Sequence, residues 1–408
     1  MSARFEIAVI RDHEALADLR KEWAALHRQV GPGSPFEHPA WAETWARHFV
    51  RDGDLECVAV RDPERDGSLI GFAPLYRRHY SIGGLRATCV QPLGTGRGQA
   101  LTEVVQLLAV RERRIDVIRA VSQHVAQLDG ANWIQLSLGP EQGWLLPQWI
   151  DGDANAFVTH RRTRPCVVID HLPAQHEVLR SRLKRNVRES IRRSRNRSAK
   201  LGDMTFRCAS DVTDVEDVMP ALVELHHMRA RMPGAVEHID MFRRAESIDF
   251  LVEAVTRLAE DGLARVHVAE HRGKPVAAIL ILSDGATDYL SVTGLDPAYW
   301  PLSLNTMLLY QALAEAVSRG RVAMNLSTGP DVAKMRWSST ITAYQEFAIV
   351  HHDRKSRWLY GASAHASLLV EHHLRARLNQ VRTDSRHVRR SRPSIARAIT
   401  GSVAKNPH

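Results

Sequence analysis

Apolar and polar positions are patterned most regularly between residues 288 and 337, and this stretch organises our prediction of the fold. Apolar and β-prone residues over 289–295 predict a strand, which an Asp-Pro step ends. Helical spacing over 304–317 predicts a helix, and Gly320 stands where a C′ glycine commonly ends one. Residues 322–326 alternate again as a second strand. The helix is just long enough to return the chain so that both strands enter one sheet.

The turn between the first strand and the helix is where we expect an anion to bind. Pro301 suits the first helical turn or the step before it, and Ser303 is a good N-cap. The first amides of a helix lack intrahelical acceptors, and at the end of a strand they converge on one spot. This geometry favours a phosphate or another anionic group.

A repeat of this unit predicts the fold class. Residues 136–140 read LSLGP and residues 326–330 read LSTGP, and each copy ends a unit of helix, short turn and strand. A predicted hairpin lies further back in both halves, around residues 62–67 and 272–275. We therefore predict an α/β fold with two copies of one domain, each a mixed twisted sheet flanked by helices. The expected parts are residues 1–165, 166–352 and 353–408, the last a helix followed by a basic, partly disordered tail.

The loop that follows the first strand carries a resemblance to a known superfamily. Residues 295–305 read LDPAYWPLSLN, which resembles the acyl-donor loop V-x-P-x-x-R-x-x-G-x-G of the GNAT (Gcn5-related N-acetyltransferase) superfamily. The Asp-Pro-Ala-Tyr opening fits, whereas Leu302, Ser303 and Asn305 stand where the glycine-rich part belongs. Glycine lets a backbone approach a pyrophosphate closely, so its loss bears directly on coenzyme A binding.

Over about residues 5–350 the chain is similar to the CelD-like acetyltransferases found with cellulose biosynthesis. The run from Gly329 through Lys334 to Trp337 resembles their G-x-x-x-x-K-x-x-(W/F) ending. These proteins are in turn related to the Fem peptidyltransferases, which take the aminoacyl group from aminoacyl-tRNA. The resemblance implies tandem GNAT-like domains with the active cleft at or near the second domain.

The resemblance and the residue types together suggest the site. Acyl transfer to an amine needs positioning, a proton acceptor and N–H groups for the developing oxyanion. Our candidates for handling protons are Asp296, Tyr299 and His227. The donor is expected to contact the loop and the first helical turn, at Leu302, Ser303, Leu304 and Asn305. Substrate contacts are expected from Arg229, Arg231, Ser327, Lys334 and Trp337.

Residues 179–201 predict one amphipathic helix with an unusual charge. Leu179, Leu183, Val187 and Ile191 form an apolar stripe, and the other side is rich in arginine with Glu189 as its single acid. Dense like charges repel along a helix, so either this face is simply solvated or an anion such as tRNA, coenzyme A phosphates or an acidic carrier protein lies beside it. The residues that we expect to meet such a partner are Arg185, Arg188, Arg192 and Arg193.

The composition of the chain further narrows the possible classes of protein. The 408 residues are 44% hydrophobic and carry a net charge of +9, which suits a large core and an anionic partner. The four cysteines lie far apart without metal-ligand spacing, so we expect no metal and a reducing compartment. No signal peptide or spanning apolar run is evident, and we expect a cytoplasmic protein.

Three functional hypotheses remain at this point. The first is an N-acyltransferase that joins an acyl-coenzyme A donor to an amine on a small molecule or saccharide. The second is an aminoacyl-tRNA-dependent transferase that acts on an amine of a natural product or cell-wall precursor. The third is a non-catalytic, nucleic-acid-binding member of the fold, although no zinc-finger or RRM-type motif supports it.

Overall fold

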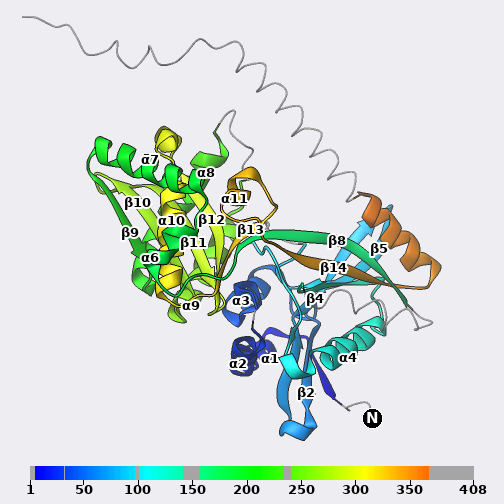
Figure 1. Cartoon of the computed structure of the whole chain (residues 1–408). Helices are drawn as coiled ribbons and strands as arrows, with labels where there is room; N and C mark the ends of the chain where they lie inside the picture. The colour runs from blue at the N-terminus through cyan, green and yellow to red at the C-terminus, as the bar shows by residue number, and fades with distance from the viewer. Residues whose placement is uncertain (1–4, 32, 97–100, 141–155, 233–239, 367–408) are drawn as a thin grey trace, which may run out of the picture.

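A computed structural model describes residues 5–31, 33–96, 101–140, 156–232 and 240–366 of the chain. The predicted class of a mixed α/β fold with helices flanking the sheets is confirmed (Figure 1). One sheet has four strands in the order β1-β2-β3-β6, and the other has ten. No helix within these ranges is long and apolar enough to cross a membrane.

The first half supplies the small sheet and one end of the large one. Its elements are β1 (Glu6–Ile10), α1 (His13–Asp18), α2 (Arg20–Val30), η1 (Pro35–Glu37), α3 (Pro39–Phe49), β2 (Cys57–Asp62), η2 (Pro63–Arg65), β3 (Ser68–Ala73), β4 (Leu75–Ile82), β5 (Leu85–Pro92), β6 (Leu108–Ala109), η3 (Arg111–Arg113), α4 (Arg114–Ala126), β7 (Trp133–Leu138) and β8 (Ala156–Ile169).

The second half supplies the rest of the large sheet and its covering helices. Its elements are α6 (His176–Arg182), α7 (Arg185–Leu201), β9 (Met204–Ala209), α8 (Val212–Ala230), α9 (Ala245–Glu260), β10 (Ala264–His271), β11 (Lys274–Ser283), β12 (Thr287–Leu295), η4 (Pro297–Leu302), α10 (Leu304–Ser318), β13 (Ala323–Thr328), α11 (Val332–Met335) and β14 (Ile341–His351). Residues 354–366 are helical, and the predicted basic tail beyond them lies outside the described residues.

The large sheet joins both halves of the chain in the order β4-β5-β7-β14-β8-β13-β12-β11-β10-β9. In this order β14 pairs with β7 of the first half, and β8 pairs with β13 of the second. β8 and β14 also pair with each other and run side by side across the middle of the molecule (Figure 1). The predicted boundary between residues 165 and 166 therefore falls inside β8.

Strand β11 shows how the sheet is covered on both faces. Ala277, Ile279 and Ile281 point into a core shared with α7 and α10. The alternate residues Leu280 and Leu282 point into a core shared with α8 and α9. This period of two buries both faces of the strand, and the helices on either side shield the sheet from water.

The two halves share one of these cores. Trp41 and Trp45 on α3 are 0% and 1% exposed and pack in this core. The Trp41 ring lies 5.0 Å from the ring of Phe250 on α9, edge to face. The Tyr289 hydroxyl of β12 donates to the carbonyl oxygen of Gly33 at 2.7 Å. These contacts fix the first half against the face of the sheet opposite α7 and α10.

The helix predicted over 179–201 is in fact two helices. α6 ends at Arg182, Leu183 is extended with φ −68° and ψ 140°, and α7 begins at Arg185. The break keeps Leu183 buried in the core under α10, while the Lys184 ammonium donates to the carbonyl oxygen of Met335 at 3.0 Å. Sequence periodicity missed the break because the apolar stripe continues across it at the same spacing.

Candidate active site

A pocket opens where two parallel strands part. β12 and β13 pair only from Thr287 to Tyr289 on one strand and from Ala323 to Asn325 on the other, and they diverge beyond these residues. A cavity of about 380 Å³ fills the gap, lined by both strands, α10, α11, the end of α8 and one residue from the first half. The carboxyl ends of parallel strands in open α/β sheets are common ligand sites.

The loop that leads into α10 differs from the predicted cradle. Residues Pro297–Leu302 form the 3₁₀ helix η4, and Ser303 follows in the left-handed region with φ 56°. Ser303 occupies the predicted N-cap position, but its side chain accepts no capping hydrogen bond. Leu302 and Leu304 pack against the core, so only Ser303 and Asn305 of the four predicted donor contacts present polar side chains here.

One end of the pocket is basic. Arg229, near the end of α8, hydrogen-bonds to the Thr293 hydroxyl on β12, and burial lowers the pKa of its guanidinium. Asn305, with its amide oxygen toward α8, accepts from Arg229 Nη1 at 3.2 Å. Gly294 makes this approach possible, since a Cβ there would stand 2.6 Å from the Leu225 Cβ. The predicted partner Arg231 lies exposed just beyond the helix and does not line the pocket.

The opposite side of the pocket holds a carboxylate from the first half of the chain. Glu103 lies between β5 and β6, and its carboxylate accepts hydrogen bonds from the Ser327 hydroxyl and the Thr328 backbone N–H. Burial raises the pKa of Glu103 to about 7, although these bonds and the charge of Lys334 act against the rise. A carboxylate with a pKa near neutrality and hydrogen-bonding partners in a cavity is suited to general acid–base chemistry.

The strand beside Glu103 is strained at the same point. Ser327 has φ 76°, a conformation that non-glycine residues rarely adopt, and its backbone N–H donates to Asn325 Oδ1 at 2.9 Å. The pairing of β13 with β8 shifts register between Asn325 and Thr328, so the chain bulges toward the pocket. Lys334 Nζ donates to the Thr328 carbonyl oxygen at 2.6 Å. Strain of this kind is commonly found where a site holds a side chain in place.

A third cationic group lies between the pocket and α7. Arg336 Nη2 donates to the Thr306 hydroxyl in the first turn of α10 at 2.8 Å. Burial lowers the pKa of Arg336, and the positive charge of Arg193 on α7 lowers it further. Arg197 Nη1, one turn along α7, donates to the Pro301 carbonyl oxygen at 2.5 Å. The neighbouring guanidiniums of Arg193 and Arg336 lie beside the amino end of α10, and an anion bound there would stabilise both charges.

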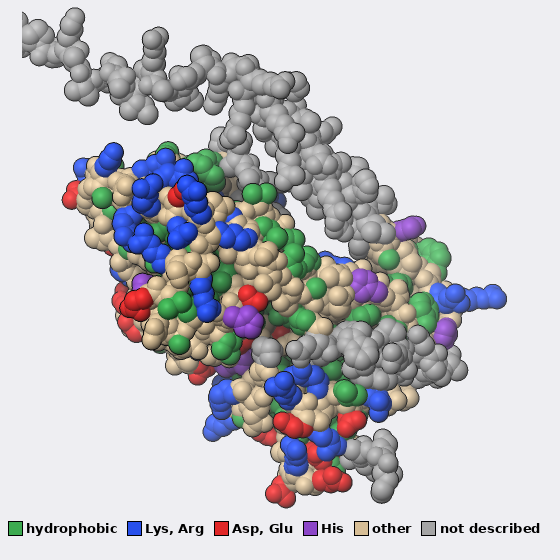
Figure 2. All heavy atoms as spheres, in the orientation of Figure 1, with side chains coloured by type: hydrophobic (Ala, Val, Ile, Leu, Met, Phe, Trp, Pro, Cys, Tyr) green, Lys and Arg blue, Asp and Glu red, His purple; other side chains and the backbone are tan. Residues whose placement is uncertain are grey.

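The arginines of α7 divide between two directions. Arg197 contacts η4, and Arg193 lies near enough to Arg336 to affect the pKa of that guanidinium. An open groove of about 450 Å³ lies on the outer side, over α6 and α7. Its basic residues are Arg180, Arg185, Arg188 and Arg192. Figure 2 shows lysine and arginine side chains gathered on the surface around α7.

The structure brings some of the predicted site residues together and separates others. Five of them line the pocket: Arg229, Asn305, Ser327, Lys334 and Trp337. The three candidates for handling protons do not line the pocket, and each interacts with a residue that does not line it either. Asp296 accepts from an η4 amide at 2.9 Å, the Tyr299 hydroxyl lies 2.7 Å from His271 Nδ1, and His227 Nδ1 lies 3.2 Å from an Asp240 oxygen.

The comparison with protein families agrees with this geometry. Residues 185–335, which include α7, the pocket-forming strands and α10, match the model of the acetyltransferase (GNAT) domain family. This match indicates a GNAT-type domain in the second half of the chain, and residues 185–335 are called the GNAT domain below. The strands β12 and β13, and the loop that leads from β12 into α10, all lie within the matched residues.

Solved structures extend the likeness to the whole fold. The crystal structure of FemX superposes with a TM-score of 0.57 at 12% identity, over 83% of this chain and 96% of that chain. A conserved protein from Bacteroides thetaiotaomicron superposes with a TM-score of 0.53 at 13% identity, over 85% of this chain and 100% of that chain. The C-terminal domain of a putative lysylphosphatidylglycerol synthetase from Agrobacterium fabrum superposes with a TM-score of 0.50 at 12% identity, over 87% of this chain and 97% of that chain. No curated protein matches the sequence.

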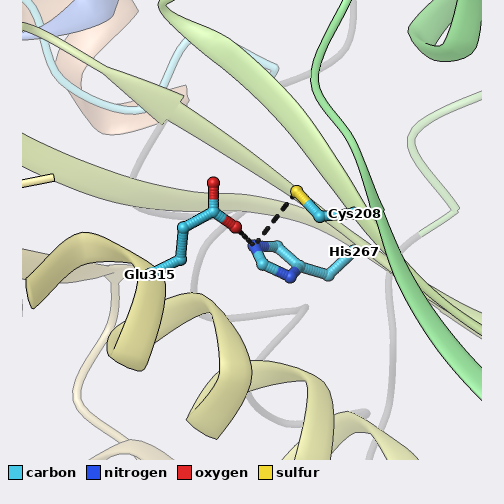
Figure 3. A group of neighbouring side chains, drawn as sticks. All are labelled: Cys208, His267 and Glu315. Carbon is cyan, nitrogen blue, oxygen red and sulfur yellow. Dashed lines mark hydrogen bonds and ion pairs between the residues drawn. The ribbon is translucent and has the colours of Figure 1, made fainter. Parts of the chain in front are cut away.

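One side-chain cluster in the GNAT domain offers metal-ligand atoms (Figure 3). His267 Nε2 on β10 lies 3.8 Å from Cys208 Sγ on β9 and 3.4 Å from Glu315 Oε2 on α10. Arg319 Nε and Arg265 Nε stand 2.8 and 3.6 Å from Glu315 Oε1. The positive charges of Arg265 and Arg319 already neutralise the Glu315 carboxylate, so a divalent cation bound here would be repelled by them. We interpret the cluster as a network that ties α10 to β9 and β10.

Proposed function

We propose that this protein is an N-acyltransferase that joins the acyl group of a coenzyme A thioester to an amine on a small molecule or saccharide. The pocket between β12 and β13 carries the proposal. It lies within a GNAT domain, and the amino end of α10 and Glu103 both belong to its surroundings. The acceptor and the thioester would meet in this gap.

The basic groups beside α10 support an anionic donor. Arg193 and Arg336 place two positive charges next to Thr306, where the first amides of α10 lack intrahelical acceptors. The phosphates of coenzyme A would separate these like charges and accept hydrogen bonds from both. The glycine-poor loop is compatible with this arrangement because the contacts come from α7 and Arg336 as well as from the loop itself.

Glu103 supports the chemical step. The acceptor nitrogen attacks the acyl carbonyl, the C–N bond forms, and the C–S bond breaks with release of a thiolate that takes a proton from water. The nitrogen loses one proton to the Glu103 carboxylate, which later returns it to solvent. Backbone N–H groups exposed where β12 and β13 part would stabilise the oxyanion. Arg229 and Asn305, at the other end of the cavity, would orient the acceptor.

The two directions of the α7 arginines give a matched test of the donor. Arg193→Glu is expected to raise the KM for acetyl-coenzyme A about tenfold or more, because it reverses a charge beside the proposed phosphates. Arg192→Glu makes the same change on the outer groove and should leave KM within about twofold. Release of free coenzyme A thiol with a panel of small amines measures both.

Transfer from aminoacyl-tRNA is the second candidate, and the outer groove of α6 and α7 favours it. A polyanion as large as tRNA would cover Arg180, Arg185, Arg188 and Arg192 together. In that case Arg192→Glu and Arg193→Glu would weaken the binding of the donor to similar extents, and no thiol would be released from acetyl-coenzyme A. Equal effects of the two variants on a thioester reaction would contradict the proposed placement of coenzyme A.

A further inference from the structure

The first half of the chain contains a second gap of the same kind. β5 and β7 are parallel and pair only at Cys89 with Trp133 and at Val90 with Ile134. Beyond this pairing lies a cavity of about 250 Å³, lined by the ends of both strands. The strand pattern matches that of the GNAT domain: β4, β5, β7 and β14 pair as β11, β12, β13 and β8 do. The first half thus repeats the arrangement that forms the proposed active site.

This second pocket carries a large excess of positive charge. Among the residues that the structure describes, its lining includes the guanidiniums of Arg78, Arg161, Arg162 and Arg164 and one carboxylate, that of Glu346. Glu346 Oε2 lies 2.6 Å from Arg162 Nε and 3.3 Å from Arg161 Nη1, and Arg164 binds its other oxygen. The Glu103 carboxylate, outside this lining, also interacts with Arg164. These two carboxylates cannot neutralise four guanidiniums, and the surplus of positive charge favours an anion in the cavity.

The loop over residues 94–96, which follows β5, forms part of the wall. Gly96 has φ 76°, and a Cβ there would stand 2.0 Å from Gln91 Nε2 and 2.3 Å from Arg78 Nη1. The positive φ favours glycine at this position, and the loop passes close to the ends of both side chains. Gln91 is held in turn by hydrogen bonds to the Tyr76 hydroxyl and the Thr95 carbonyl oxygen. The loop, Gln91 and Arg78 thus form one packed wall of the cavity.

We propose that this pocket binds a small ligand with at least two negative charges, carried on phosphate or carboxylate groups. Arginine forks suit both groups, because two parallel N–H donors match two oxygens of either one. The ligand would lie beside the segment that carries Glu103, since the neighbouring residue Thr102 lines this second pocket. The proposal does not depend on acyl transfer in the GNAT domain and stands if that activity fails.

Calorimetric titration of the full chain with inorganic pyrophosphate and, separately, with citrate tests this site and distinguishes phosphate from carboxylate. We expect one of the two anions to bind, and Arg78→Gln to weaken its binding at least about tenfold. Arg161→Gln is a second variant with the same expectation. Arg86→Gln removes the same charge from an exposed position on the β4–β5 hairpin and should leave binding unchanged.

The anion site beside α10 could also attract these probes, and Arg193→Glu separates the two sites. Binding that survives Arg193→Glu and is weakened by Arg78→Gln supports the second pocket. Binding that Arg193→Glu removes and Arg78→Gln leaves intact overturns the proposal. The proposal is also overturned if neither pyrophosphate nor citrate binds. Circular dichroism establishes that each variant is folded, and a variant that is not folded is replaced by the other arginine substitution.

Discussion

Replacing Glu103 with glutamine is expected to lower kcat/KM for acyl transfer by about 10²- to 10⁴-fold, the usual contribution of a general base. Glutamine has nearly the same shape and can still accept from the Ser327 hydroxyl and the Thr328 N–H. It cannot take a proton from the attacking nitrogen. The substitution therefore removes the proposed chemistry while it leaves the pocket filled and the buried hydrogen bonds in place.

The pH profile of the same reaction gives a second readout. Burial raises the pKa of Glu103 to about 7, so the carboxylate is protonated and inactive below that pH and becomes a base above it. In the wild-type protein kcat/KM should rise as the pH increases through about 7. Glu103→Gln should abolish this limb, whereas Glu112→Gln, which alters an exposed acid in the same half, should preserve both rate and profile. An unchanged profile in Glu103→Gln would exclude the residue as the base.

Replacing Asp288 with alanine is expected to lower the free energy of unfolding by about 3–5 kcal/mol, the usual effect of removing one partner from a buried ion pair. Asp288 on β12 is 0% exposed, and it binds Arg265 on β10, which is 1% exposed. Arg321 Nε lies 3.4 Å from its other oxygen. Removal of the carboxylate leaves the Arg265 guanidinium buried with Glu315, 3.6 Å from Arg265 Nε, as its remaining acidic neighbour.

This ion pair also supports the pocket. Asp288 pairs in register with Met324, one position before Tyr289 and Asn325, the last pair before β12 and β13 part. Urea unfolding followed by circular dichroism measures the loss in Asp288→Ala. Glu189→Gln is the matched control, since it breaks the exposed Arg185–Glu189 pair on α7 and should cost under about 0.5 kcal/mol. A loss below about 1 kcal/mol in Asp288→Ala would contradict the importance of the buried pair.

The strand–helix–strand unit could be predicted from sequence because local signals agree throughout it. The apolar and β-prone residues of β12, the helical spacing in α10 and the C′ glycine Gly320, at φ 70°, all indicate one arrangement. The LSLGP and LSTGP repeat was equally informative, since both copies end strands, β7 and β13, that pair in parallel with β5 and β12. The family resemblance, together with residue type, then predicted substrate contacts at Arg229 and Lys334, and both residues line the pocket.

The missed features depend on contacts between distant segments. Glu103 lies far along the chain from Ser327 and Lys334, in an irregular segment with no period to mark it, so nothing local indicated its role. The pairing of β8 with β13 and of β14 with β7 is likewise invisible to patterning within either half. Asp296 and Tyr299 have suitable chemistry in the right loop, but η4 turns them toward an amide and toward His271.

A single titration tests most directly whether the amino end of α10 holds the acyl donor. Acetyl-coenzyme A and aminoacyl-tRNA are titrated at low and physiological salt against the wild type, Ser303→Glu and Ser303→Gly. An acid at a helix amino end stabilises the helix, so Ser303→Glu should stay folded while it repels an anionic donor. Glycine suits the φ of 56° and adds no charge.

We predict that acetyl-coenzyme A binds the wild type and Ser303→Gly with micromolar affinity and that Ser303→Glu abolishes this binding. Binding of acetyl-coenzyme A that is equally strong in all three proteins would contradict the account, because the donor would then lie elsewhere. Failure of acetyl-coenzyme A to bind, with tRNA binding that survives physiological salt, would replace the thioester by aminoacyl-tRNA as the donor.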